Sequence, residues 1–225
     1  MSPTVLPTAP RAVHVDASTR QDSPSAGTPD LHRSSTSGTL LCVDEGTSEV
    51  MRDTKDWTWV LERPCEQCGF DAAGVARHQV GARLRAGMPT WHRLLSGPTA
   101  TRRPDPTTWS PLEYACHVRD VHIVFSARVA MVLGQHDPEF ANWDQDETAE
   151  SQAYAEQDPA TVARELAQET ERVAAAYDVL DPTDEALWAR PARRSNGSVF
   201  TLDSLARYHL HDVEHHVWDV RPAGA

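Results

Sequence analysis

The sequence lacks the features that mark membrane and secreted proteins. No apolar run approaches the roughly 20 residues that a transmembrane helix requires. The amino terminus has neither the basic start nor the apolar core of a signal peptide. Four cysteines among 225 residues are too few for a disulfide scaffold in a chain of this length. We therefore expect a cytoplasmic protein that spans no membrane.

An excess of positive charge is also missing. The chain has 21 Lys and Arg against 33 Asp and Glu, which gives a formal net charge of −12. Acidic protein surfaces are repelled by phosphate backbones and by anionic lipid headgroups. We expect neither a nucleic-acid partner nor a membrane surface, and we expect the partner to be a small-molecule substrate.

The first fifty residues differ in composition from the rest of the chain. They are rich in Ser, Thr, Pro and Ala and show neither a helical nor a strand period. Such a segment cannot bury enough apolar surface to offset the entropy lost on ordering. Residues 1–50 are therefore expected to be a disordered tail, or an extension in front of a true start at Met51. A single domain is expected over residues 51–225.

Four helical patterns follow this tail. The helices are predicted over residues 72–95, 111–134, 159–180 and 202–220. Ser110, Asp158 and Thr201 are the expected N-caps of the last three, and proline follows the first two of these at the first helical position. No segment alternates apolar and polar residues as a half-buried strand does. We therefore predict an all-α protein built as a four-helix bundle.

The first of these helices has the weakest pattern. Asp71 stands where an N-cap is expected. Gly87 and Pro89 fall inside the segment, and an internal proline removes a helical hydrogen bond and clashes with the preceding turn. We expect a bend at this point.

Two connections between the helices are also informative. Residues 135–157 are acidic, include Trp143 and Tyr154, and are long for a bundle loop. This connection is expected either to cross the bundle or to cover a site. Residues 188–196 are basic and are expected to form a loop.

Histidines in the last helix carry the clearest chemical signal. His211 and His215 are four residues apart, so their imidazoles share one helix face and can bind a single ion. His117, about two turns into the second helix, is the best candidate for a third ligand. Three neutral imidazoles suit zinc, nickel, copper or iron and leave a coordination position open for water or substrate. The sequence thus predicts a metal centre of His117, His211 and His215.

A simpler interpretation of the same histidines also fits the pattern. The main apolar stripe of the last helix includes Leu210, Val213 and Val217, and His211 and His215 fall on the opposite side. Histidines in that position are commonly exposed to solvent. Tyr208 and Trp218 flank the pair on the same face, however, and such aromatic neighbours are typical of a pocket wall.

Two short blocks resemble a known family. WSPLEYACHVRD resembles the second-helix signature of DinB-like proteins, in which an inward-facing histidine follows a tryptophan by eight residues, as His117 follows Trp109. HDVEHHVWDV resembles the last-helix signature of the family, a His followed by Asp or Glu and by a second His four positions after the first. His211, Asp212 and His215 match it. The order and lengths of the four helices agree over roughly residues 57–220.

The resemblance implies a four-helix bundle, often a homodimer, that holds a divalent metal through three histidines. Related families include the bacillithiol-dependent S-transferases and the mycothiol-dependent maleylpyruvate isomerases, whose metal binds a low-molecular-weight thiol as thiolate. Isomerase-like relatives have a carboxylate at the first position of the last-helix pair, where this chain has His211. This difference favours the all-histidine branch. The alternative register, which pairs Asp212 with His216, remains open.

Several other side chains are candidates for supporting roles. Tyr208 and Trp218, with Arg193 and Arg194, are predicted to contact substrate, because arginine binds carboxylates through two hydrogen bonds. Arg190 belongs to the same basic cluster, which on a loop is more often simply solvated. Asp120 and Asp212 are predicted to orient a ligand imidazole through a hydrogen bond.

Cys65 and Cys68 form a Cys-x-x-Cys motif just before the first helix. The motif can be half of a zinc site, a redox pair or two inert thiols. A four-cysteine site needs a second such motif, and thioredoxin-like chemistry needs a βαβ context. The sequence offers neither, so a structural or incidental role is expected, with redox sensing as the lesser alternative.

These observations favour a metal-dependent enzyme. We expect a thiol S-transferase or hydrolase in which a low-molecular-weight thiol, such as mycothiol, or a metal-activated water attacks a small electrophile. A non-catalytic metal-binding bundle in stress response or protein interaction is the alternative, followed by a helical bundle that binds no metal. A zincin-type protease is excluded, because Asp212 stands where that motif requires glutamate.

Overall fold

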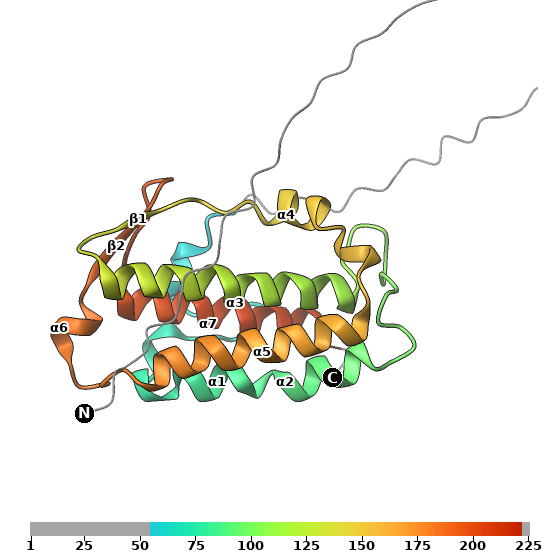
Figure 1. The fold of residues 1–225 in the computed structure, drawn as a ribbon, viewed down its shortest axis with the longest axis horizontal. Coiled ribbons are helices and arrows are strands. Elements are labelled where there is room, and N and C mark those ends of the chain that lie inside the picture. Colours follow the sequence, from blue (N-terminus) through green and yellow to red (C-terminus); the bar gives the residue numbers. More distant parts are fainter. Residues whose placement is uncertain (1–54, 222–225) are drawn as a thin grey trace, which may run out of the picture. The chain divides into compact units, whose positions relative to one another are not determined.

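A computed structural model describes residues 55–221 of the chain. The predictions for residues 1–50 and for Met51 lie outside the described residues. Within them, the predicted all-α four-helix bundle is confirmed (Figure 1). Its long helices are α1 (Val80–Ala86) continued by α2 (Met88–Leu95), α3 (Pro111–Gly134), α5 (Pro159–Asp178) and α7 (Leu202–Asp219).

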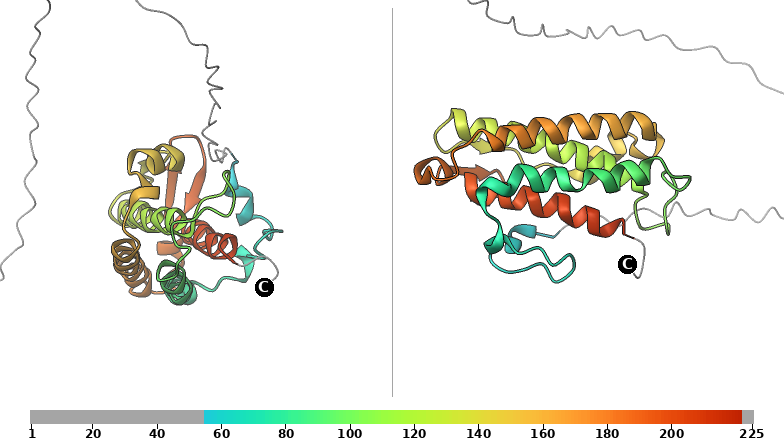
Figure 2. Two further views of the ribbon diagram at one scale, coloured as in Figure 1. Left: turned by 90° about the vertical axis from the view of Figure 1, so that its right-hand side faces the viewer. Right: turned by 90° about the horizontal axis from the view of Figure 1, so that it is seen from below.

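The helices do not follow their sequence order around the bundle. Helix α1 packs against α5 and α7, and α3 packs against the same two helices. Around the bundle the order is therefore α1 with α2, then α5, α3 and α7, as the end-on view in Figure 2 shows. The neighbouring positions of α3 and α7 matter for function, because these two helices carry the predicted histidines.

The three predicted N-caps are confirmed. The Ser110 hydroxyl accepts a hydrogen bond from the Glu113 N–H, and the Glu113 carboxylate accepts one from the Ser110 N–H, which completes a capping box. Asp158 accepts from the Thr161 N–H at 2.8 Å. Thr201 accepts from the N–H three residues later at 3.1 Å. Each such cap contributes about 1 kcal/mol to helix stability.

The first helix starts later than the sequence predicts. Asp71 is a cap, but it caps the short 3₁₀ turn η2 (Ala72–Gly74), and the α-helix begins only at Val80. The predicted bend is a full break at Gly87, which separates α1 from α2. The cause is Pro89 in the first turn of α2, since it has no N–H to continue the hydrogen bonds of α1.

The prediction that the chain has no strand was wrong. Three short strands, β1 (Glu139–Phe140), β2 (Pro191–Arg194) and β3 (Val199–Thr201), form a sheet in that order. β1 pairs with β2 in parallel, and β2 pairs with β3 as an antiparallel hairpin. Strands of two to four residues are too short to show alternation. The usable signal was Asn196-Gly197, a typical hairpin turn pair, with Gly197 at φ +97°.

Two irregular segments cover the bundle next to the predicted histidines. The connection between α3 and α5 contains α4 (Gln145–Ser151) and η4 (Tyr154–Glu156), and both pack on α3. The segment before the bundle contains η1 (Trp57–Leu61), η2 and η3 (Arg77–Gln79), and both η1 and η2 pack on α7. A single turn, α6 (Glu185–Trp188), leads into the hairpin.

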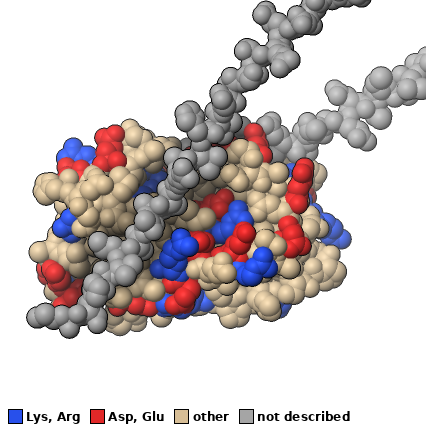
Figure 3. Space-filling model, viewed as in Figure 1, with Lys and Arg blue, Asp and Glu red and all other residues tan. Residues whose placement is uncertain are grey.

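The surface of the described part carries both signs of charge close together. On the face seen in Figure 3, Lys and Arg side chains lie beside Asp and Glu side chains. Ion pairs join some side chains of opposite charge, such as Arg85 of α1 with Glu171 and Asp178 of α5. Among the helices of residues 55–221, none is long and apolar enough to cross a membrane.

Candidate metal centre

Helix α7 presents candidate metal ligands on two adjacent faces. An α-helix turns by about 100° per residue, so residues four apart share a face and residues one apart do not. His211 and His215 therefore form one pair, and Asp212 and His216 form a second pair on the next face. Each pair meets a different partner from elsewhere in the chain.

The second pair meets His117 of α3. His117 Nε2 and His216 Nε2 each lie 3.5 Å from Asp212 Oδ1. The two imidazole rings are perpendicular, with centroids 4.6 Å apart. One ligand atom from each residue lies within 4.8 Å of the other two. We call these three residues the His–Asp–His cluster.

The ring nitrogens of His117 and one carboxylate oxygen of Asp212 are buried ligand atoms that make no hydrogen bond within residues 55–221. His117 is completely buried, and neither of its ring nitrogens has a hydrogen-bond partner within residues 55–221. The same holds for Asp212 Oδ1. An unpaired buried polar group costs about 1–3 kcal/mol, so such groups need an explanation. Two nitrogens and a carboxylate oxygen that converge in this way fit a divalent cation.

Charge states in the cluster also suit metal binding. Burial lowers the pKa of His117, so the imidazole is neutral at neutral pH and offers a nitrogen lone pair. Burial alone would raise the pKa of Asp212, but the imidazoles of His117 and His216 beside its carboxylate hold this pKa below its ordinary value. A neutral imidazole and an ionised carboxylate are the forms that bind metal.

Neighbouring side chains orient both imidazoles. The His117 ring stacks on Trp143 at 5.4 Å with an interplanar angle of 9°, and Trp109 lies 5.5 Å away. His216 Nδ1 lies 2.8 Å from Asp219 Oδ2, which leaves Nε2 directed at Asp212. Because Trp143 belongs to the connection between α3 and α5, this connection covers the site, one of the two possibilities that its length indicates.

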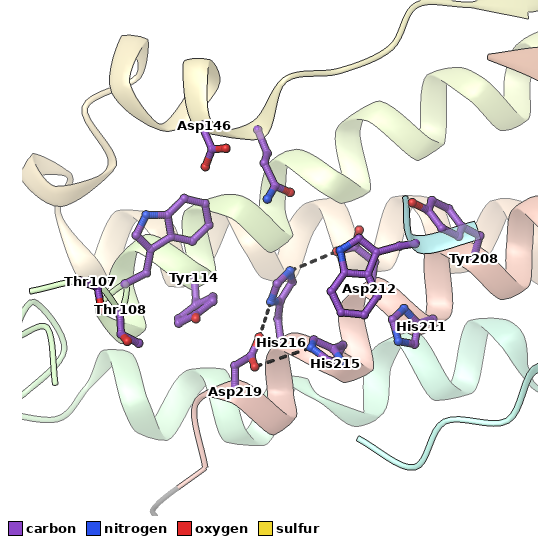
Figure 4. Close-up of a pocket in the computed structure, with 13 residues that line it drawn as sticks. Thr107, Thr108, Tyr114, Asp146, Tyr208, His211, Asp212, His215, His216 and Asp219 are labelled. Carbon is purple, nitrogen blue, oxygen red and sulfur yellow. Dashed lines mark hydrogen bonds and ion pairs between the residues drawn. The ribbon is translucent and has the colours of Figure 1, made fainter. Parts of the chain in front are cut away.

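A cavity of about 230 Å³ opens beside the cluster (Figure 4). Asp212 and His216 of the cluster line it together with His211 and His215. Its other walls include Trp57, Trp109, Tyr114, Gln145, Asp146 and Tyr208. A ligand in this cavity therefore has access to the cluster from one side.

The first pair meets the Cys-x-x-Cys motif instead of His117. Cys65, Cys68, His211 and His215 each offer a ligand atom within 4.8 Å of the other three. Cys65 Sγ lies 3.7 Å from His215 Nδ1. We call these four residues the Cys–His cluster. The predicted set of three histidines is thus divided, with His117 in one cluster and His211 and His215 in the other.

His211 and His215 are buried, and a segment distant in sequence buries them. Their exposed fractions are 3% and 7%. Trp57 lies 5.6 Å from the ring of His211 and 5.0 Å from that of His215, and the edge of Phe70 meets His211 at 5.3 Å. The apolar stripe of α7 is as expected, with Leu210 and Val213 buried. The opposite face is covered by η1 and the turn after it, so it is not a solvated face.

The predicted substrate-contacting residues have different positions. Tyr208 lines the cavity. Trp218 packs on the His215 ring at 5.6 Å. Arg194 lines a second hollow next to this cavity, with Trp57 and Tyr208 at both. Arg193 of the central strand β2 forms an ion pair with Asp137, which lies just before β1.

The residues predicted to support the metal ligands also lie in different places. Asp120 accepts a hydrogen bond from the Tyr154 hydroxyl at 2.6 Å and another from Arg119 at 2.8 Å. Within residues 55–221, no hydrogen bond joins Asp120 to His117. Asp212 lies inside the His–Asp–His cluster, where its own oxygen is a ligand candidate. Arg190 donates to the Val132 carbonyl at the end of α3.

The sequence interpretation kept His216 only in the alternative register with Asp212, and it identified no residues that could complete a zinc site with the two cysteines. Two signals were present in the sequence. Asp212 and His216 flank the apolar stripe of α7 at helical spacing, which turns them toward the neighbouring helix more than His211 and His215. The Cys-x2-Cys and His-x3-His spacings together match the usual ligand spacing of four-coordinate zinc.

Comparisons with known proteins agree with the fold. The family model of the DinB superfamily matches residues 78–220, so the resemblance seen in the sequence is confirmed. YfiT from Bacillus subtilis, described as a probable metal-dependent hydrolase with an unusual four-helix bundle topology, has a similar structure, with a TM-score of 0.51 at 18% identity. The match covers 64% of this chain and 79% of YfiT. No curated protein matches the chain significantly.

Proposed function

This chain belongs to the DinB superfamily, and we propose that it is a divalent-metal-dependent enzyme acting on a small electrophile. His117, Asp212 and His216 hold the metal. The observation that carries the proposal is the convergence of buried ligand atoms of His117 and Asp212 that make no hydrogen bond within residues 55–221, next to a cavity that Asp212 and His216 line. A structural zinc site normally has four protein ligands, whereas three ligands beside a cavity are typical of a catalytic site.

The surrounding residues prepare the ligands. Stacking on Trp143 holds the His117 ring in place, and the Asp219 carboxylate orients His216. When bound, the metal supplies Lewis acidity, which lowers the pKa of a thiol or water that it coordinates. Asp219 and Asp146 stand at the cavity and are groups able to receive a proton there.

The ligand set favours a thiol as the nucleophile. Asp212 and His216 place a carboxylate at the first position of the last-helix pair, which is the arrangement that the sequence resemblance attributes to the mycothiol-dependent isomerases. Two neutral imidazoles and one carboxylate leave a divalent ion with one positive charge. Such a centre favours an anionic ligand such as a thiolate. We therefore propose a low-molecular-weight thiol, of which mycothiol is one, as the co-substrate.

The cavity limits the electrophile to a small molecule. Its volume of about 230 Å³ is below the range of about 300–1,000 Å³ of ligand pockets. Trp57, Trp109 and Tyr114 give it aromatic walls. Asp146 and Asp219 make it acidic, so a neutral or cationic substrate is favoured over an anionic one.

Hydrolysis is the second candidate. The description of YfiT as a probable metal-dependent hydrolase supports it, although the likeness at 18% identity concerns the fold alone. The two candidates differ in the nucleophile, a thiol or a water. Turnover that requires an added thiol identifies an S-transferase or isomerase, and turnover without any thiol identifies a hydrolase.

The test begins with metal content measured by mass spectrometry of the full chain and of a His117→Ala, His216→Ala double variant. We expect the double variant to lose one equivalent of metal and all turnover of electrophiles screened with and without mycothiol. His78→Ala is the matched control, because His78 is exposed and lies outside both clusters. Equal metal content in the double variant and the control would refute the proposed ligands.

A further inference from the structure

The Cys–His cluster brings together parts of the chain that are far apart in sequence. Cys65 and His215 are separated by 150 residues, yet Cys65 Sγ and His215 Nδ1 lie 3.7 Å apart. One ligand atom from each of Cys65, Cys68, His211 and His215 lies within 4.8 Å of the others. Two sulfurs and two imidazole nitrogens are a donor set that tetrahedral zinc commonly takes.

The turn that carries the cysteines is shaped to point both sulfurs in one direction. The Cys65 N–H donates to the Phe70 carbonyl at 2.8 Å, and the Gly69 N–H donates to the Cys65 carbonyl at 2.9 Å. Gly69 has φ +76°, a conformation that glycine adopts without strain. Both thiols therefore come from one short turn, and their sulfurs lie within 4.8 Å of each other.

The two histidines are arranged as ligands. His211 is 3% exposed, and its Nε2 has no hydrogen-bond partner in the described part of the chain. His215 directs Nδ1 at Cys65, and its Nε2 lies 3.7 Å from Asp219 Oδ1. A carboxylate on the far nitrogen of a metal-binding histidine is a common arrangement, because it fixes the ring and raises its basicity.

We propose that Cys65, Cys68, His211 and His215 form a second metal site, a closed four-ligand zinc site with a structural role. On binding, Zn²⁺ displaces one proton from each thiol to solvent and forms two sulfur and two nitrogen bonds. Two thiolates and two neutral imidazoles make the loaded site electrically neutral. Neutrality removes most of the cost of burying the ion, which suits a site in which Cys65 is 1% exposed.

The proposed zinc joins the segment before the bundle to α7. This segment also supplies Trp57, which lines the cavity beside the His–Asp–His cluster. The zinc site therefore positions one wall of that cavity while standing outside the reaction. Its existence does not depend on the proposed function, because its ligands are different residues.

A redox role for the two cysteines fits the structure less well. A disulfide between Cys65 and Cys68 gives no role to the buried nitrogens of His211 and His215, whereas zinc uses all four side chains. A disulfide also leaves the unpaired His211 Nε2 without an explanation.

The experiment measures zinc and cobalt in the full chain purified under reducing conditions. We expect two equivalents of zinc in the wild type. We expect one equivalent in Cys65→Ser, Cys68→Ser and two in Cys116→Ser, whose sulfur is buried beside Tyr154 and Gln157. In the cobalt-substituted wild type, we expect a thiolate-to-cobalt charge-transfer band and intense tetrahedral bands.

The cobalt spectrum keeps the proposal testable if the double cysteine variant does not fold. Absence of the thiolate band in the cobalt-loaded wild type would overturn it. So would mass spectrometry showing a Cys65–Cys68 disulfide in the reduced preparation. The His117→Ala, His216→Ala variant separates this proposal from the proposed function. It should retain the thiolate band unchanged, and loss of the band there would refute two independent sites.

Discussion

The two clusters on α7 use neighbouring residues of one helix, yet their environments differ. The Cys–His cluster has four ligand candidates, and Cys65, His211 and His215 are less than one-tenth exposed. The His–Asp–His cluster has three, and its Asp212 and His216 side chains are 24% and 17% exposed, toward the cavity. A fourth protein ligand closes a metal site, whereas a cavity in its place leaves room for substrate.

The net charge of the metal-loaded site also differs between the two clusters. Two cysteine thiolates neutralise a divalent ion, while the single carboxylate of Asp212 leaves one positive charge. A neutral centre whose four coordination positions are all filled by protein has little tendency to bind a further ligand. A positive centre beside a cavity attracts an anion. The comparison thus assigns structure to one face of α7 and chemistry to the next.

Metal removal should give the largest effect and should affect the two clusters differently. If zinc stabilises the fold through the Cys–His cluster, a chelator lowers the free energy of unfolding by about 4 kcal/mol relative to free zinc at about 1,000 times its dissociation constant. Chemical denaturation of wild type and of Cys65→Ser, Cys68→Ser measures this. The cysteine variant should lose the response to zinc, and the His117→Ala, His216→Ala variant should retain most of it.

Acid should lower the stability of the protein through a third group of histidines, which is buried but belongs to neither metal cluster. His122 Nδ1 lies 3.0 Å from His209 Nε2, and the Tyr177 hydroxyl lies 3.3 Å from His209 Nδ1. Burial lowers the pKa of His122 to about 4, so between pH 6.5 and 4 the unfolded chain binds a proton that the folded chain does not. Stability should therefore fall as the pH falls, by about 3 kcal/mol over this window from His122.

A His122→Asn variant tests the source of that acid sensitivity. Denaturation curves of metal-loaded wild type and variant, measured at several pH values, give the slope of unfolding free energy against pH. The variant should have the shallower slope between pH 6.5 and 4, whatever its stability at pH 7. Identical slopes would show that His122 takes up its proton equally in both states.

Asp219 connects the two clusters and tests how separate they are. Its Oδ2 lies 2.8 Å from His216 Nδ1, and its Oδ1 lies 3.7 Å from His215 Nε2 (Figure 4). Loss of a carboxylate behind a metal-binding histidine costs about 10–100-fold in metal affinity. Asp219→Asn should therefore weaken zinc binding at both clusters, measured by competition with a chelating dye. Weakening at one cluster alone would assign the carboxylate to that cluster.

How far the sequence predicts this arrangement depends on the range of the interactions. The N-caps and His117 depend on residues a few positions apart, so their patterns can be read locally. His211 and His216 fall into different clusters because only one face of α7 meets α3. The apolar stripe of α7 indicates that face only indirectly. Cys65 and His215 are 150 residues apart, so each local motif shows a ligand spacing but not that the two motifs meet. The short strands are likewise defined by pairing and not by alternation.

The smallest expected effect concerns Asp120, which the sequence assigned to the support of a ligand histidine. In the structure its carboxylate accepts from Tyr154 and Arg119 instead. Tyr154→Phe removes one hydrogen bond to this carboxylate while Arg119 still pairs with it. The expected loss is about 1 kcal/mol of unfolding free energy, with metal affinity at both clusters unchanged. A drop in metal affinity comparable to that of Asp219→Asn would restore Asp120 as a supporting residue of His117. An unchanged affinity would limit support of the metal ligands to Asp219, Trp109 and Trp143, which contact the histidine rings directly.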